Sequence, residues 1–261
     1  MTIGYWVDRP SAEFRALDGA RTIAVLPLGA SEQHGPHLPL STDRDLVDEV
    51  VRRALPLLDG SFSVLVLPTL AVCKSNEHAA FPGTLTLSAE TLLRVIGEIG
   101  GCVASAGVRR LALFNGHGGN VAVMEIAARE LRAQQRLITA SCSWYQLCAA
   151  ERELDARELA HGIHAGDLET SAMLAAYPAL VRFEHARDFP SATERWAEQF
   201  GTIGLGSRPA RPGWLMEDLN PDGACGDASA ATAAKGQRLL EAGAAGLADF
   251  LREFATFDPS A

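Results

Sequence analysis

The chain has 261 residues, of which 48% are hydrophobic and 21% charged, a balance typical of a globular protein with a sizeable core. Its net charge of −9 disfavours a nucleic-acid partner, which would require a basic surface. The five cysteines are scattered without a Cys-x-x-Cys pair, so they indicate no disulfide framework.

The first residues lack the basic-then-apolar order of a signal peptide. No apolar run approaches the roughly 18 residues of a membrane span. Together with the cysteine pattern, these features lead us to expect a cytoplasmic protein with no membrane partner.

Apolar runs that alternate with helical patterns predict an α/β fold with a mostly parallel sheet. Residues 22–28 are continuously apolar, as in a strand that is buried on both faces. No repeat or linker divides the chain, so we expect a single domain over residues 1–261. We expect strands at residues 22–28, 62–70, 109–114 and 137–142, and helices at residues 43–58, 88–106, 120–135, 166–176 and 229–254.

Side chains that bind metals follow two of the predicted strands. Glu32 and His34 come after the first strand, and residues two apart in an extended segment point to the same face. His117 follows the third strand, and parallel strands end at one edge of a sheet. Asp43, at the start of the next helix, can bridge two ions with its two oxygens. The sequence therefore predicts a metal site of one or two divalent ions (zinc, manganese or iron) at this edge.

Further residues are candidates for the same pocket. His164 and Glu169 form a third group of potential ligands. Gly118 and Gly119 can expose backbone N–H groups to a substrate, although a tight turn with positive φ angles would also explain them. Trp144 and Tyr145, like Trp214, are candidates for the pocket wall, with ordinary core packing as the alternative. We expect His37 to lie beside the ligands, and His78, His161 and His185 to be ordinary polar residues.

Three stretches of the chain resemble the creatininase family of metal-dependent amidohydrolases. They are residues 29–40 (Gly-Ala-Ser-Glu-Gln-His-Gly-Pro-His-Leu-Pro-Leu), 115–120 (Asn-Gly-His-Gly-Gly-Asn) and 164–171 (His-Ala-Gly-Asp-Leu-Glu-Thr-Ser). Weaker matches are residues 81–84, 226–227 and 235–236, so the resemblance covers most of the chain. It implies an α/β/α sandwich, a two-metal site, hydrolysis of cyclic or linear amides, and a homo-oligomer that is often a ring-shaped hexamer.

The resemblance also implies roles for single residues. Glu32, His34, Asp43 and His117 match the family's metal ligands, with Asp43 as the bridge, and His164 matches a residue that transfers a proton. Creatinine hydrolases proper carry Gly-His-Tyr-Glu-Asn in the second stretch, and that glutamate is a ligand. Gly119 stands in its place here, so Glu169 is our candidate for the missing ligand.

The Gly-His-Gly-Gly variant is similar to family members that deformylate a nucleotide precursor or trim a peptide-derived cofactor, which disfavours creatinine as the substrate. Our hypothesis is a metal-activated hydroxide that attacks an amide carbonyl, with His164 protonating the departing nitrogen. Two alternatives stay open. One is a metal-independent serine hydrolase, although the chain has no Gly-x-Ser-x-Gly motif. The other is a non-catalytic, metal-stabilised protein that binds a metabolite.

Overall fold

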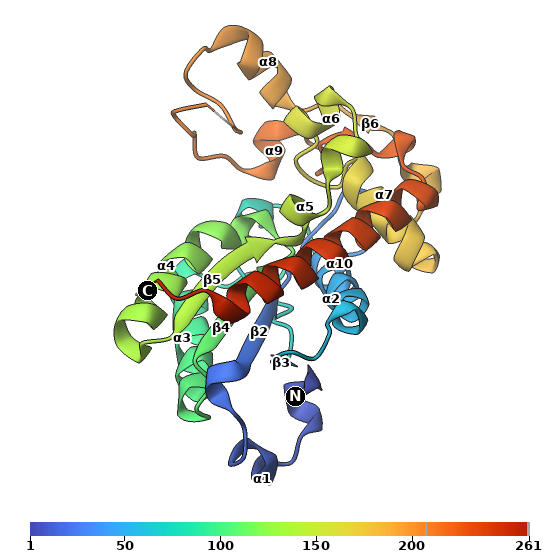
Figure 1. Cartoon of the computed structure of the whole chain (residues 1–261). Coiled ribbons are helices and arrows are strands. Elements are labelled where there is room, and N and C mark those ends of the chain that lie inside the picture. The colour runs from blue at the N-terminus through green and yellow to red at the C-terminus, as the bar shows by residue number, and fades with distance from the viewer. Residues whose placement is uncertain (207, 260–261) are drawn as a thin grey trace.

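Five parallel strands form the central sheet, in the order β1-β3-β2-β4-β5 (Figure 1). The computed structural model describes residues 1–206 and 208–259. The strands are β1 (Ile3–Tyr5), β2 (Thr22–Leu28), β3 (Ser63–Val66), β4 (Arg110–Asn115) and β5 (Ile138–Ser143).

The position of β2 in the middle of the sheet explains its uninterrupted apolar sequence. All seven of its residues are buried, because β3 and β4 flank it and helices cover both faces. The four predicted strands are confirmed, although β3 is shorter than expected and continues only as a single bridge between Leu28 and Leu70. The edge strand β1 was not predicted, since three residues show too little periodicity.

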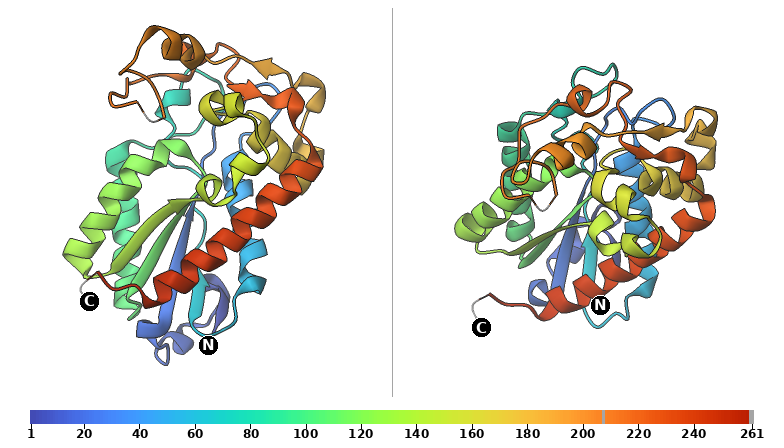
Figure 2. Two further views of the ribbon diagram at one scale, coloured as in Figure 1. Left: turned by 45° about the horizontal axis from the view of Figure 1, so that its top comes forward. Right: turned by 90° about the horizontal axis from the view of Figure 1, so that it is seen from above.

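Helices cover both faces of the sheet and complete the predicted three-layer α/β/α sandwich (Figures 1 and 2). One face packs against α2 (Thr42–Ala54), α7 (Asp167–Ala176) and α10 (Ala233–Thr256). The other face packs against α3 (Ala89–Ser105) and α4 (Val121–Gln135). Each interface buries a hydrophobic core of its own.

Local signals explain several helix boundaries. The Ser88 hydroxyl caps α3 by accepting a hydrogen bond from the Thr91 N–H at 3.1 Å. Gly107, at φ +84°, follows the end of the same helix. The predicted helix over residues 43–58 ends earlier, at Ala54, where a 3-10 turn (Leu55–Leu57) with a proline in its first turn follows.

The segment between α7 and α10 lies above the carboxyl edge of the sheet (Figure 2). The sequence predicted irregular loops over residues 181–228. The described residues of this segment instead form two short α-helices and a two-stranded antiparallel ribbon: α8 (Ala192–Gln199), α9 (Met216–Leu219), β6 (Asp188–Phe189) and β7 (Gly226–Asp227). The remaining short helices are α1 (Ser11–Phe14), α5 (Trp144–Leu147) and α6 (Ala156–His161).

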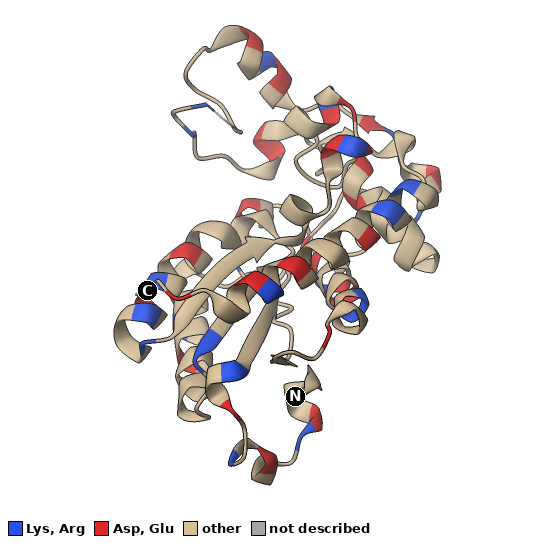
Figure 3. Cartoon of the chain, in the orientation of Figure 1, with Lys and Arg blue, Asp and Glu red and all other residues tan. Residues whose placement is uncertain are grey.

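Charged residues of both signs are distributed over many elements of the fold (Figure 3). The long helix α10 carries both blue and red segments along its length. Within the described ranges, none of the helices has both the length and the apolar composition of a membrane span.

Candidate metal centre

Two glycines bring the loops after β2 and β4 onto the start of α2. A Cβ atom on Gly29 would lie 2.6 Å from the Cα of Arg44, and one on Gly116 would lie 2.5 Å from the carbonyl oxygen of Asp43. Real Cβ atoms do not approach other atoms so closely, so only glycine permits this packing. The close approach places Asp43, in the first turn of α2, between the ends of the two strands.

Two asparagines of the second motif hold the loops together. The Asn115 side chain accepts a hydrogen bond from the N–H of His117 at 3.1 Å and donates one to its carbonyl oxygen at 2.6 Å. The Asn120 amide donates to the Gly29 carbonyl at 3.0 Å and accepts from the Lys74 N–H at 3.2 Å. These bonds join the segments that follow β2, β3 and β4, so they fix the backbone on which His117 sits.

Asp43 lies between two groups of potential ligands. Its Oδ2 is 3.3 Å from His117 Nδ1, which is also 3.1 Å from Glu32 Oε1. Its Oδ1 is 3.2 Å from His34 Nε2, which is 4.0 Å from Glu169 Oε2. Each group brings three ligand atoms within 4.8 Å of one another, which fits one ion per group with Asp43 shared. A third possible group consists of Glu32, His34 and His164.

Three histidines of the centre each have one ring nitrogen within hydrogen-bond distance of a backbone carbonyl oxygen. His34 Nδ1 lies 3.0 Å from the Glu32 carbonyl, His117 Nε2 lies 2.9 Å from the Lys74 carbonyl, and His164 Nε2 lies 2.7 Å from the Gln33 carbonyl. Because a carbonyl oxygen only accepts, each of these nitrogens carries the proton and donates. The opposite nitrogen of each ring therefore faces the carboxylates, an arrangement typical of histidines that bind metals.

Three of the carboxylate oxygens at the centre lack donors. Both side-chain oxygens of Glu32 and the Oδ2 of Asp43 are buried and make no hydrogen bond among the described residues. Leaving buried carboxylate oxygens without a partner is costly, and a cation would offset this cost. The residues present therefore fit a divalent metal.

The pKa values of the carboxyl groups reflect their burial and the charges beside them. Burial raises the pKa of Glu32 above its usual range, and the neighbouring Asp43 charge raises it further. Burial also raises the pKa of Glu169, to about 7. Burial alone would raise the pKa of Asp43 as well, but His34 and His117 hold it well below its usual range. Asp43 is therefore the carboxylate that stays ionised most readily.

The neighbouring carboxylates raise the pKa values of the imidazoles of His34 and His117. Burial favours a low pKa for His34, but Asp43 outweighs it and raises the pKa to about 10. Burial is likewise outweighed at His117, where Glu32 and Asp43 raise the pKa well above the usual value. The carboxylates thus attract positive charge to the positions where an ion would bind, and metal binding there releases protons.

A cavity of about 820 Å³ opens onto the centre. Asp43, His117 and Glu169 lie on its wall, as do Gly118, Gly119, Tyr145, His164 and Trp214. Gly118 and Gly119 begin a 3-10 turn (Gly118–Asn120) between β4 and α4, but neither has a positive φ angle, so the prediction of positive φ angles is wrong. A Cβ atom on Gly118 would meet nothing within 4 Å, whereas one on Gly119 would collide with its neighbours.

Trp144 was expected in the pocket, and this expectation is wrong. Its side chain is 1% exposed and packs in the core beneath α10, because the first turn of α5 points it toward the sheet. His37 contacts Thr170 beside Glu169, with its Nε2 2.9 Å from the hydroxyl oxygen. His161 bonds to Thr193 away from the centre, and His185 is exposed, as expected of ordinary polar residues.

Two residues of the segment that follows β3 were missed. His78 places its Nε2 3.3 Å from Glu32 Oε1, and its Nδ1 lies 2.8 Å from the side-chain nitrogen of Gln33. Glu77 lies on the cavity wall with its Oε1 3.6 Å from His117 Nε2. An acidic residue next to a histidine after a predicted strand is the signal that could have identified both.

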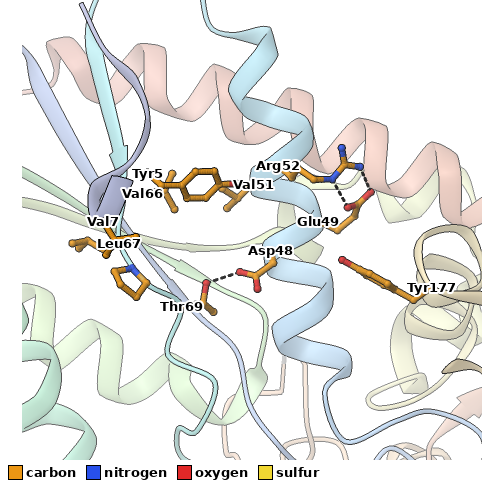
Figure 4. Close-up of a pocket in the computed structure, with 11 residues that line it drawn as sticks. Tyr5, Val7, Asp48, Glu49, Val51, Arg52, Val66, Leu67, Thr69 and Tyr177 are labelled. Atoms are coloured by element: carbon orange, nitrogen blue, oxygen red, sulfur yellow. Dashed lines mark hydrogen bonds and ion pairs between the residues drawn. The ribbon is translucent and has the colours of Figure 1, made fainter. Parts of the chain in front are cut away.

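A second pocket, of about 310 Å³, lies beside α2 and the edge strand β1 (Figure 4). Figure 4 shows Asp48 accepting a hydrogen bond from the Thr69 hydroxyl, and Arg52 paired with Glu49. The three ligand groups found in the described part of the chain lie elsewhere. This pocket is therefore separate from the candidate metal centre.

The fold and the centre define an α/β protein with buried carboxylate–histidine groups that could hold a metal ion. The chain belongs to the creatininase family, whose model, described as creatinine amidohydrolase, matches residues 8–251. The resemblance drawn from the motifs is confirmed.

Two relatives with different named activities have nearly the same sequence identity to this chain. The mycofactocin precursor peptide peptidase of Mycobacterium tuberculosis is 33% identical over 247 residues, covering 89% of this chain and 85% of that protein. The creatinine amidohydrolase of Pseudomonas putida is 32% identical over 247 residues, covering 88% and 89%. Both names describe enzymes that hydrolyse C–N bonds.

Solved structures of creatininases share the fold. A crystal structure of creatinine amidohydrolase has a TM-score of 0.73 at 28% identity and covers 97% of this chain and 98% of that one. A mutant creatininase described as of Zn-Zn type has a TM-score of 0.75 at 28% identity, with the same coverage. A manganese form has a TM-score of 0.72 at 26% identity and covers 98% and 100%.

Proposed function

We propose that this protein is a metal-dependent hydrolase of C–N bonds that uses two divalent ions. Glu32, Asp43 and His117 would hold one ion, and His34, Asp43 and Glu169 the other. The proposal is carried by the anchored histidines, each with its second nitrogen turned toward a carboxylate, and by the three buried oxygens of Glu32 and Asp43 that lack donors. Zinc and manganese are the metals printed for the related structures.

When bound, the ions would supply hydroxide at neutral pH and polarise the substrate carbonyl. In this proposal, His164 moves the proton. Burial, and then the charges of His34 and His78, lower its pKa well below the usual value, so its ring starts neutral. Because Nε2 donates to Gln33, the free Nδ1 faces the centre, 3.8 Å from Glu32 Oε1. This nitrogen can accept a proton and deliver it to the departing amine.

We propose an amide larger than creatinine, such as a short peptide, as the substrate. Gly118 leaves open space on the cavity wall where creatinine hydrolases carry a tyrosine, so an extended chain has room there. The peptidase relative supports this class. A homo-oligomer and a cytoplasmic location remain predictions.

The metal-independent serine hydrolase finds little support. Ser75 lies 3.5 Å from His117 Nε2, but it is completely buried, lies off the cavity wall, and faces a nitrogen that already donates to the Lys74 carbonyl. A nucleophile must reach the substrate.

Hydrolysis of an amide panel by the zinc- or manganese-loaded protein tests the proposal. The panel contains creatinine, N-formyl compounds and short peptides, with and without a chelator. We expect hydrolysis that the chelator abolishes, with peptides preferred, and a Gly118→Tyr variant that binds metal normally but loses peptide activity. Turnover that resists the chelator would contradict the metal mechanism. Absence of turnover with both ions bound would favour the non-catalytic alternative.

A further inference from the structure

Glu77 occupies the space that a side chain at position 119 would need. A Cβ atom on Gly119 would lie 2.1 Å from Glu77 Oε1, 2.4 Å from His117 Nε2 and 2.5 Å from the Lys74 carbonyl oxygen. Creatinine hydrolases proper carry a glutamate at this position. In this chain, the absence of a side chain at 119 admits a carboxylate from a different segment, the 3-10 turn Asn76–His78.

The Glu77 carboxylate lies between His117, a candidate metal ligand, and the ammonium group of Lys74. Its Oε1 is 3.6 Å from His117 Nε2, and its Oε2 is 3.0 Å from the ammonium of Lys74. The carbonyl oxygen of Lys74 accepts the hydrogen bond from the same His117 nitrogen. One short segment of chain thus gives His117 Nε2 a hydrogen-bond acceptor, the Lys74 carbonyl, and places a negative charge 3.6 Å from the same nitrogen.

This contact is on the edge of the imidazole away from the ion. His117 turns Nδ1 toward Glu32 and Asp43, and Nε2 toward Glu77. A carboxylate next to the N–H of a ligating histidine fixes the orientation of the ring and makes its other nitrogen a stronger donor to the metal. Glu77 can therefore act on the ion through His117 without touching it.

We propose that Glu77 is a positioning residue for His117 and occupies, from a different segment, the space that a side chain at position 119 would fill. The inference rests on the proposed two-ion site. It is specific to one of the two proposed ion positions, because the ion pairs of Glu77 are with His117 and Lys74, whereas His34 pairs with Asp43 and Glu169.

Stepwise zinc affinities of the full chain test the proposal, measured by competition with a chromophoric chelator. The variants are Glu77→Gln, which keeps the size of the side chain, and Glu77→Ala. Glu90→Gln is the matched control, since Glu90 also pairs with one basic residue on its own segment, Arg94, but lies on the surface. We expect both Glu77 variants to bind one ion roughly 10- to 100-fold more weakly and the other ion as before. The melting temperature of the metal-free protein should change little in Glu77→Gln.

Wild-type affinity for both ions in the two Glu77 variants would overturn the proposal. Equal weakening of both ions, with a lower melting temperature of the metal-free protein, would also overturn it, because it would show a purely structural role. Failure of the proposed function gives a different result. A wild-type protein that binds no zinc refutes the two-ion site, and one that binds two ions without hydrolysing amides refutes only the catalysis.

Discussion

At the scale of single residues, His164 combines a fixed orientation with a free nitrogen. The Gln33 carbonyl holds its Nε2, and its ring lies between those of His34 and His78, with centroids 4.2 and 4.4 Å away. The ring can neither turn nor move aside easily. Its Nδ1 therefore has the fixed position that the proposed proton transfer requires.

We predict that His164→Ala keeps both ions but lowers turnover about 10²- to 10⁴-fold, the usual contribution of a well-placed acid or base. Steady-state kinetics together with metal analysis measure both effects. The exposed His185 provides the control, since His185→Ala should change neither. Unchanged turnover would remove His164 from the mechanism, and loss of an ion would make it a ligand in the third group.

We predict that a glycine-to-alanine substitution has opposite effects on stability at Gly116 and at Gly97. Gly116→Ala would place its Cβ 2.5 Å from the Asp43 carbonyl oxygen, so we expect a loss of stability of about 1–3 kcal/mol and weaker metal binding. Gly97, inside α3, has nothing within 4 Å of its Cβ position, so Gly97→Ala should stabilise the protein by ~0.5–1 kcal/mol. Urea unfolding of the metal-free proteins measures both. The reverse order would contradict the packing described here.

At the scale of secondary-structure elements, Glu158 joins three segments beside the centre. Its carboxylate, on α6, accepts hydrogen bonds from the N–H of Asp167 at 2.7 Å and of Asp227 at 2.8 Å. Asp167 begins α7, which carries Glu169, and Asp227 lies on β7. Three glycines make room for this carboxylate, since Cβ atoms on them would lie 2.1–2.6 Å from its atoms: Gly162, Gly166 and Gly226.

We predict that Glu158→Ala destabilises the protein by at least ~1–3 kcal/mol, the cost of leaving a buried donor unsatisfied. Since the start of α7 would shift, the ion bound by His34 and Glu169 should also bind more weakly. Urea unfolding and metal titration measure these effects, with the exposed Glu151→Ala as control. Wild-type stability in Glu158→Ala would show that the junction does not depend on this carboxylate.

The sequence predicted those parts of the fold that local patterns determine. Continuous apolar runs identified the buried strands, and their parallel order brought Glu32 and His117 to one edge. Trp144 and Tyr145 show where this reasoning fails. Adjacent residues of a helix face different directions, so one enters the core and the other lines the cavity, and composition does not distinguish them. The contact of Glu77 with His117 depends on a loop path that no periodicity encodes.

At the scale of the whole molecule, the candidate metal centre lies between β2, α2, the loop after β4 and α7. We predict that removing the ions lowers the free energy of unfolding. Each ion stabilises the native state by ~2.7 kcal/mol when its free concentration is 100 times its Kd. Thermal unfolding with and without a chelator measures the effect. A melting temperature that does not depend on the metal would contradict a shared site between these elements.

The metal content of the purified chain, measured beside three variants, tests the central claim most directly. We predict about two ions per wild-type chain, as in binuclear hydrolases. His117→Ala and His34→Ala should each retain one ion, and Asp43→Asn should lose both, because Asp43 is shared. No bound metal after reconstitution with zinc, manganese or iron, or two ions retained in Asp43→Asn, would contradict the account.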